Sequence, residues 1–338
     1  MALIKPAILF ICCITPAIVF AQADTSKSIQ ERYTDSIKHS TYPYIFPAWS
    51  KKIVKKGIDL PLPAGVMVNY FAASQDITIS DLQVGFNDNP LVPLDFIKFG
   101  KVKADIQSIS TRVDVWLLPF VNVYGMFGGT LANTSVSIVA PFNLSTSAKF
   151  NGTTAGLGIA LGGAWHGIFG SGDYNNTWSS LNNIQGSVYT QTVDFRIGHP
   201  FVFRSRPDRN ITVWAGGSGI YVGRTTEGTI QLSSLSTDAT QAELQQIKDG
   251  TAAWYQTLTP AQQVVVKQIA GALSDKINGL DIKDASISYS LLKRATSNWS
   301  MLAGGQFQLN KRWQFRTEAG FLGGRSSIMG SVNYRFGF

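Results

Sequence analysis

Charged residues placed two apart within apolar stretches carry the most informative pattern in the chain. Arg112 and Asp114 form one such pair, and Arg316 and Glu318 form another. Because residues two apart on a β-strand point to the same face, each pair would lie on one side of a sheet. Eight charges fall on such faces, four of each sign, and they are Arg112, Asp114, Asp173, Asp194, Arg196, Arg316, Glu318 and Arg335. If the opposite, aromatic faces point to lipid, all eight point into a barrel, since a lipid-facing charge near the membrane midplane costs roughly 2–4 kcal/mol.

Charges inside a barrel can do one of two things. They can line an aqueous path for solutes, or they can form an ion-pair network that fills the interior without conduction. A barrel of about twelve strands usually leaves a passage, so a small pore or solute-uptake channel that takes small solutes is the first hypothesis. The non-conducting, filled barrel is the second. The balanced signs argue against strong ion selectivity.

The side chains that could support catalysis or metal binding are poorly placed for either role. His39, His166 and His199 are isolated from one another, whereas a metal site needs several ligands at defined spacing, so no metal or other cofactor is expected. A serine nucleophile would need a base within hydrogen-bond reach, and the nearest set is His166, Ser171 and Asn175. The odd spacing of His166 and Ser171 puts them on opposite faces of a continuous strand. A lipid-modifying enzyme is therefore the least favoured hypothesis, and no catalytic residue is predicted.

A glycine-rich run at 156–163 superficially resembles a nucleotide-binding loop, but its spacing differs and no helix follows. The steric interpretation is better. Glycines on the inward face of a strand make room for large side chains from across the lumen.

Apolar and polar residues alternate in segments of roughly ten residues, separated by turn residues, which is typical of membrane β-strands. The segments lie near 64–75, 104–117, 121–131, 151–163, 168–178, 186–198, 210–222, 227–234, 284–292, 297–309, 312–322 and 326–338. The predicted fold is all-β, a transmembrane antiparallel β-barrel of about twelve strands. The eighth segment is the least regular, so ten or fourteen strands remain as alternatives.

The last segment is the clearest. One face carries Val332, Tyr334, Phe336 and Phe338, and the other carries Ser331, Asn333 and Arg335. This ending resembles the terminal strand of Gram-negative outer-membrane β-barrel proteins, which implies that Val332, Tyr334, Phe336 and Phe338 are read by the barrel assembly machinery. The stretch 112–125 also resembles outer-membrane barrel proteins of an uncharacterised family. The resemblance implies a fold and an outer-membrane location, and no activity.

Residues 1–23 have the pattern of a cleavable signal peptide. Lys5 precedes an apolar stretch, and Ala21-Gln22-Ala23 offers the small-x-small cleavage pattern. Cys12 and Cys13, the two cysteines of the chain, fall inside this segment. The mature chain would then have no cysteine, which excludes disulfides, thiolate metal sites and a cysteine nucleophile. Secretion without cysteine fits the outer membrane of a Gram-negative bacterium.

Composition excludes several other classes of protein. The 338 residues are 44% hydrophobic, 12% aromatic and 15% charged, which argues against disorder. The formal charge is +8, but the basic residues are scattered, so no nucleic-acid surface is expected. Beyond the first 25 residues no apolar run reaches the roughly 18 residues of a membrane helix.

Two segments do not fit a bare barrel. Residues 24–62 would form an N-terminal periplasmic segment. Its four lysines at 51–56 would contact anionic headgroups, or the segment would plug the barrel. The favoured interpretation is a simple amphipathic cap at the base of the barrel. Residues 235–283 have helical periodicity and predict an inserted hairpin of two helices, 239–257 and 260–276. Thr259, Pro260 and Gln262 form a helix start with a capping box.

The expected organisation is thus a signal peptide at 1–23, a periplasmic segment at 24–62 and a barrel at 63–338. Strand parity places the 235–283 hairpin on the periplasmic side, and on the cell exterior if the eighth strand is absent. The hairpin would act as a lid, plug or docking surface, or merely cover the barrel mouth. A non-conducting barrel would present loops near 76–103 and 132–150 outside the cell. The expected partners are outer-membrane lipid and the assembly machinery, and the chain is expected to be a monomer.

Overall fold

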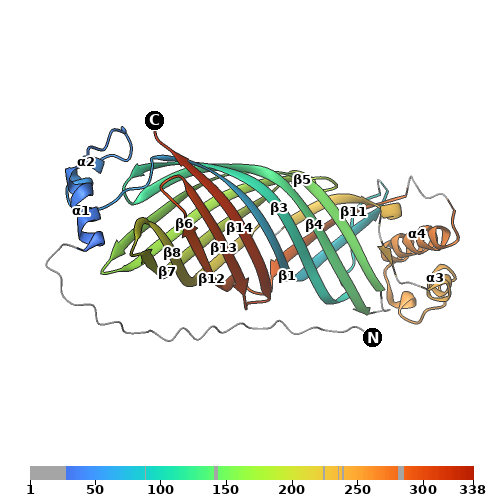
Figure 1. Cartoon of the computed structure of the whole chain (residues 1–338). Helices are drawn as coiled ribbons and strands as arrows, with labels where there is room; N and C mark the ends of the chain where they lie inside the picture. The colour runs from blue at the N-terminus through green and yellow to red at the C-terminus, as the bar shows by residue number, and fades with distance from the viewer. Residues whose placement is uncertain are drawn as a thin grey trace, which may run out of the picture.

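The chain folds into one long antiparallel barrel with helices at both ends (Figure 1). The computed structural model describes residues 28–87, 89–140, 144–223, 225–234, 236–237, 240–280 and 285–338. The expected signal peptide, with both cysteines, lies outside the described residues. None of the helices in these ranges is long and apolar enough to cross a membrane.

Ten strands close the ring, because the last strand pairs with the first. They are β1 (Ala64–Phe86), β3 (Lys98–Leu118), β4 (Val121–Ala140), β5 (Leu144–Trp165), β6 (Ile168–Leu181), β7 (Ser187–Phe203), β8 (Arg206–Val222), β12 (Trp299–Gln308), β13 (Trp313–Phe321) and β14 (Arg325–Phe336). At the closure, Ala64 pairs with Phe336 and Gln75 pairs with Arg325. All neighbours in the ring are antiparallel, as predicted.

The ring has ten strands, which was one of the two alternatives to the expected count of about twelve. The segments predicted near 227–234 and 284–292 are strands, β9 (Thr225–Gln231) and β11 (Ser286–Ala295), but they stand outside the ring. The turn between β13 and β14 comes early, so β14 covers only the first half of β1, and β11 pairs with the second half, 77–86. Periodicity detects a strand but does not say which neighbour it takes.

The barrel therefore has two tiers. The lower tier is the ten-stranded ring at the end where β1 begins and β14 ends. The upper tier consists of the far halves of β1, β3, β4 and β5 together with β9 and β11, joined by the short strands β2 (Val92–Pro93) and β10 (Ser236–Thr237). The segments 76–103 and 132–150, expected as external loops, consist largely of these strand extensions.

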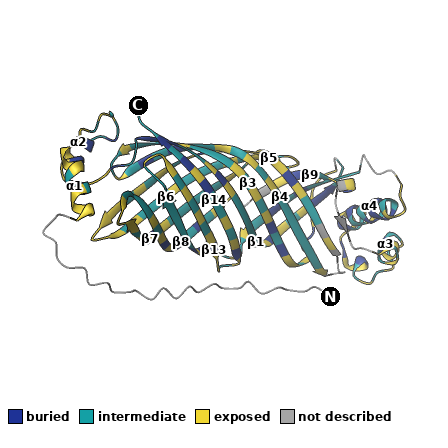
Figure 2. Ribbon diagram, in the orientation of Figure 1, coloured by how far each residue is buried: buried dark blue, intermediate teal, exposed yellow. Residues whose placement is uncertain are grey.

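The two tiers have opposite polarity, as β3 shows most clearly. In the lower tier its outward residues Ile109 and Val113 are 62% and 45% exposed, while Asp114 faces inward and is buried. In the upper tier the inward residue Val102 is buried and the outward Lys101 is exposed. The outer surface thus changes from apolar to polar between Ile109 and Gln107. Figure 2 shows exposed residues in alternation with less exposed ones along the strands of the ring.

The upper tier encloses an apolar core like that of a soluble protein. Ile79, Val102, Tyr289 and Leu291 are buried together in it. Lys293 also faces this interior, because it pairs with the inward Ile79, and its ammonium lies 5.9 Å from the centre of the Phe150 ring. This lysine forms no ion pair with a carboxylate in the described part of the chain.

Helices cap the upper tier. α3 (Gln241–Lys248) and α4 (Pro260–Ile277) pack with η1 (Leu232–Ser234) and η2 (Tyr255–Thr257) around a second apolar cluster that contains Leu244 and Leu273. The predicted start of α4 is confirmed, including the capping box of Thr259 and Gln262. The predicted helix 239–257 is wrong in its second half, because Gly250 adopts φ +65° and ends α3 there.

The cap lies at the opposite end of the barrel from the start of β1 and from the C-terminus (Figure 1). Strand parity predicts the hairpin on the same side as the start and the end of the barrel. This prediction requires β9 and β11 to be members of the ring, and they are not. α1 (Ile29–His39) and α2 (Ser50–Val54) instead lie at the lower mouth, where β1 begins and β14 ends. The four lysines of segment 51–56 are exposed there.

If the lower tier lies in lipid and the upper tier in water, an outward charge should be costly only in the lower tier. We expect Phe127→Arg, in the middle of the outer face of β4, to lower the free energy of unfolding by about 2–4 kcal/mol. Ser135→Arg, eight residues along on the same outer face, should change it by less than about 0.5 kcal/mol. Urea unfolding from phosphatidylcholine vesicles measures both, and equal losses would contradict the polarity inversion.

Lys293 makes the stability of the upper tier depend on pH. Burial among apolar groups lowers the pKa of Lys293. The unfolded chain then binds this proton more tightly than the folded chain, so stability rises with pH from the lowered pKa up to the ordinary value of about 10.4. We expect Lys293→Met to be more stable than the parent at pH 7 and to lose this rise. Thermal unfolding between pH 7 and 10.5 tests this, with the exposed, outward Lys149→Met as the control that should keep the rise.

Candidate functional site

All eight charges of the alternating pattern lie on the inner face of the lower tier. They come from β3, β6, β7, β13 and β14, and the lumen brings together side chains that are far apart in the sequence. They form two connected networks at roughly the middle of the lower tier.

The first network is centred on Glu318. Arg196 donates from Nε to Glu318 Oε2 at 2.7 Å and from Nη2 to Glu318 Oε1 at 3.1 Å. Arg196 also pairs with Asp194 at 3.0 Å, and Arg316 pairs with Glu318 at 2.9 Å. The indole of Trp214 donates to Glu318 at 2.8 Å. Because β8 and β12 separate β7 from β13 in the ring, the bidentate pair of Arg196 and Glu318 reaches across part of the lumen.

The second network starts at Arg112, whose guanidinium lies 3.6 Å from Asp173 and donates to Asn122 at 2.8 Å. Asn122 donates in turn to Asp114 at 2.6 Å. Tyr124 donates a short hydrogen bond to Asp173, and Arg112 stacks 3.5 Å above the centre of its ring. β4 and β5 separate Arg112 from Asp173, so this pair also spans strands that are not neighbours.

Asp114 and Arg335 form the most buried ion pair of the site. They lie 3.1 Å apart, and their side chains are 1% and 5% exposed. β1 runs between their strands and contributes Gly65 at this level. A Cβ atom at Gly65 would lie 2.8 Å from Asp114 and 2.9 Å from Arg335. The absence of a side chain at this position is what lets the two charges meet over β1.

Arg335 forms its ion pair with Asp114 of β3, and no ion pair joins it to Glu318 of the neighbouring strand β13. Three uncharged residues that donate hydrogen bonds within the networks were not predicted from the sequence, and they are Asn122, Tyr124 and Trp214. The alternation of the predicted strand 121–131 already puts Asn122 and Tyr124 on one face. Neither residue is charged, and charge was the signal that identified the residues lining the lumen. Gly158 makes room for a large side chain, but this is Tyr124 of the neighbouring strand β4 and not, as predicted, a side chain from across the lumen.

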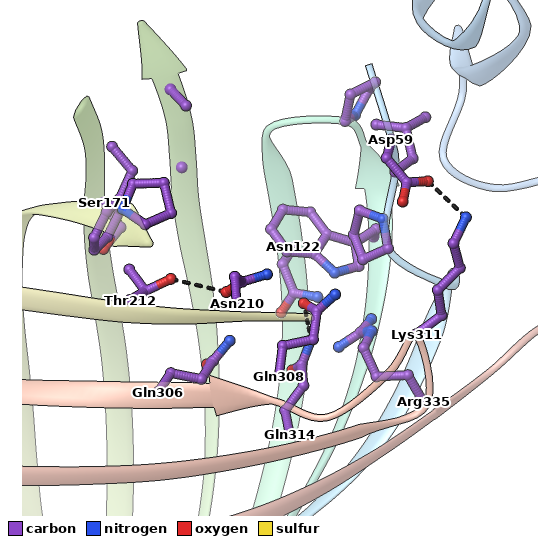
Figure 3. A pocket seen from close by; sticks show the side chains of 18 of the residues that line it. Asp59, Asn122, Ser171, Asn210, Thr212, Gln306, Gln308, Lys311, Gln314 and Arg335 are labelled. Carbon is purple, nitrogen blue, oxygen red and sulfur yellow. Dashed lines mark hydrogen bonds and ion pairs between the residues drawn. The ribbon is translucent and has the colours of Figure 1, made fainter. Parts of the chain in front are cut away.

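The two networks divide the lumen into a lower and an upper chamber. The lower chamber, of about 640 Å³, extends from the charges to the lower mouth and is lined by polar residues such as Asn210, Gln306 and Gln314 (Figure 3). The upper chamber, of about 400 Å³, extends from the charges toward the apolar core of the upper tier. Both chambers are lined by Arg112, Asp173, Arg196 and Arg316.

The N-terminal segment covers the lower mouth. Tyr33 of α1 lines the lower chamber and donates to Asp59 at 2.6 Å, and Lys311 of the β12–β13 turn pairs with Asp59 at 2.7 Å (Figure 3). The carbonyl of Leu62 accepts a hydrogen bond from Arg335 at 3.0 Å. The segment is thus tied both to the rim and to the buried ion pair.

The residues considered for catalysis do not assemble into a catalytic group. Ser171 faces the lower chamber on β6, whereas His166 lies in the turn before this strand with φ +50° and packs against Trp165. Within the described ranges, no cluster of three or more histidines, cysteines or carboxylates is arranged to hold a metal ion.

No protein-family model and no curated protein matches this sequence. Among solved structures, the chain is similar to the β domain of the Bordetella autotransporter Brka, with 9% identity over 81% of this chain and 100% of that one and a TM-score of 0.37. The transport unit of the autotransporter AIDA-I from Escherichia coli gives 8% identity, coverage of 93% and 100%, and a TM-score of 0.35. An outer membrane channel from Pseudomonas putida F1 shares 9% identity over 82% of this chain and 97% of that one, with a TM-score of 0.29. With TM-scores this low, the function proposed below rests on this chain's own residues.

The pair of Asp114 and Arg335 should behave as a unit. Removing one partner leaves a buried charge without compensation, so we expect Asp114→Asn or Arg335→Met alone to lower the free energy of unfolding by about 3–5 kcal/mol. The double variant should lose clearly less than the sum, which a double-mutant cycle measured by urea unfolding would reveal. Additive losses would contradict the pairing across Gly65.

Proposed function

We propose that this protein is a Gram-negative outer-membrane barrel with its termini and α1 in the periplasm and its upper tier and helical cap outside the cell. The apolar outer face of the lower tier supports placing this tier in a membrane. Aromatic residues near the ends of this face, such as Trp313 and Tyr334 below and Trp178 and Tyr189 above, are typical of membrane interfaces. Val332, Tyr334 and Phe338 lie exposed or partly exposed at the lower rim, where the assembly machinery would read the terminal strand.

In the described conformation the barrel is better suited to display than to conduction. Ion pairs cross the lumen between two chambers, α1 covers the lower mouth, and an apolar core fills the upper tier. Ions moving through it would have to break buried charge pairs and then pass a packed apolar core. This favours the non-conducting barrel, which was the second hypothesis from the sequence, over an open pore.

The observation that carries this proposal is the length and polarity of four strands. β1, β3, β4 and β5 have 23, 21, 20 and 22 residues, whereas about 9–11 residues cross a membrane. The surplus builds a rigid, polar-surfaced tier with its own core and a helical lid. A barrel that only needed a membrane anchor or a passage would not require this structure, so the upper tier and cap are the part that meets partners.

A gated solute-uptake channel is the second candidate. The two chambers favour it, because they meet at a layer of paired charges whose rearrangement would connect them. Solutes would then pass only after a signal moves the cap or α1.

Conductance in planar bilayers separates the candidates. We expect the mature chain to give no steady channels, because its lumen is crossed by ion pairs and filled above. Deletion of residues 240–280 should also leave it silent, since the core of the upper tier remains. Steady current in the intact chain would overturn the proposal, and current only after the deletion would favour the gated channel.

Sidedness can be tested by labelling on intact cells, because the mature chain is expected to have no cysteine. A membrane-impermeant maleimide should label Gln245→Cys, on the exposed surface of α3, in intact cells. It should label Lys52→Cys, exposed in α2, only after the outer membrane is permeabilised. The reverse pattern would contradict the proposed orientation.

A further inference from the structure

One buried charge inside the lower tier belongs to neither network. Arg325, at the start of β14, is 6% exposed and faces the upper chamber. Its partners are neutral. Nε and Nη2 donate to Ser300 Oγ at 3.1 and 2.6 Å, and Nη2 donates to the carbonyl of Ser218 at 2.7 Å.

The carboxylates that line the same chamber are already engaged. Asp194 pairs with Arg196, Glu318 pairs with Arg196 and Arg316, and Asp173 pairs with Arg112. Among the described residues, no carboxylate lies within 4 Å of the Arg325 guanidinium. Since the eight predicted charges cancel, Arg325 leaves the interior of the lower tier with one positive charge in excess, on which Asp194 acts only from beyond ion-pair distance. A buried charge of this kind is costly unless an anion accompanies it.

The chamber around Arg325 is amphipathic. Ser300 of β12 and Ser327 of β14 line the chamber with hydroxyls, while Phe71, Leu302 and Met329 contribute apolar surface. Its volume of about 400 Å³ falls in the range of roughly 300–1,000 Å³ in which proteins hold small molecules.

We propose that the upper chamber binds an organic monoanion, with a carboxylate on Arg325 and an apolar tail against the chamber wall. A single uncompensated arginine matches one negative charge, whereas a phosphate dianion would call for a second cation. Guanidinium and carboxylate also fit each other geometrically, because parallel N–H groups can meet both oxygens. The tail would use apolar surface that a purely ionic ligand would leave in contact with water. This site is independent of the proposed display function, because binding requires no passage through the lumen.

Equilibrium dialysis of labelled octanoate tests the proposal. The full mature chain is refolded with octanoate present, so that entry is not limiting, and is placed in phosphatidylcholine nanodiscs, with protein-free nanodiscs as the background. We expect about one octanoate per barrel. Arg325→Met should weaken binding at least about tenfold, as expected for loss of a charge-assisted hydrogen bond. Arg294→Met, an exposed arginine on β11, is the matched control that should bind like the parent.

Two further measurements keep the proposal falsifiable. 1-Octanol has the same tail without the charge, and equal binding of octanol would overturn the role assigned to the carboxylate. Urea unfolding without ligand should show that Arg325→Met is folded and no less stable than the parent, since the substitution removes an uncompensated buried charge. Absence of octanoate binding to the parent, or unchanged binding to a folded Arg325→Met variant, would overturn the site. Neither result bears on conductance or sidedness.

Discussion

The interior of the lower tier depends on charge pairs that join strands which are not neighbours in the sheet. Backbone hydrogen bonds hold each strand to the next, but Arg196 with Glu318 and Arg112 with Asp173 connect strands that two others separate in the ring. A charge cannot face lipid at low cost, so the charges of a membrane barrel are directed inward. There, each one must find a partner or retain water. If the lower tier lies in lipid, as proposed, the inward direction of the charges follows from the membrane. Their pairs also divide the lumen into two chambers.

The same constraint explains why the barrel changes character along its length. With the lower tier in lipid, as proposed, polar groups must lie inside it. Above it, water outside would permit polar residues on the outer face, and the interior closes on an apolar core of Ile79, Val102, Tyr289 and Leu291. The early turn between β13 and β14 makes this change possible, because it frees half of β1 to pair with β11 and draws the upper wall in around that core.

A barrel filled in this way places its function at the ends and in the chambers. The helical cap lies over one mouth and α1 over the other, and under the proposed function the upper tier and cap are the surfaces that meet partners. Inside, Arg325 is a buried charge of the lower tier that forms no ion pair with a carboxylate of the described residues, and it stands where hydroxyl and apolar surface meet. Display outside and binding inside are compatible, because they use different parts of the chain.

The sequence by itself determined the strands, their antiparallel order and the direction of the eight charges, because alternation with period two depends on local geometry and on the cost of facing lipid. It also determined the start of α4, since the capping box of Thr259 and Gln262 is local. Only the tertiary structure decided how many strands close the ring. β9 and β11 have the sequence pattern of any other strand, and their place depends on β1 pairing with β14 in its first half and with β11 in its second. Only the tertiary structure decided which charges pair, because the partners of Asp114 and Glu318 come from strands far apart in the chain. It also distinguished Arg325, since a charge is uncompensated only with respect to neighbours that folding brings near.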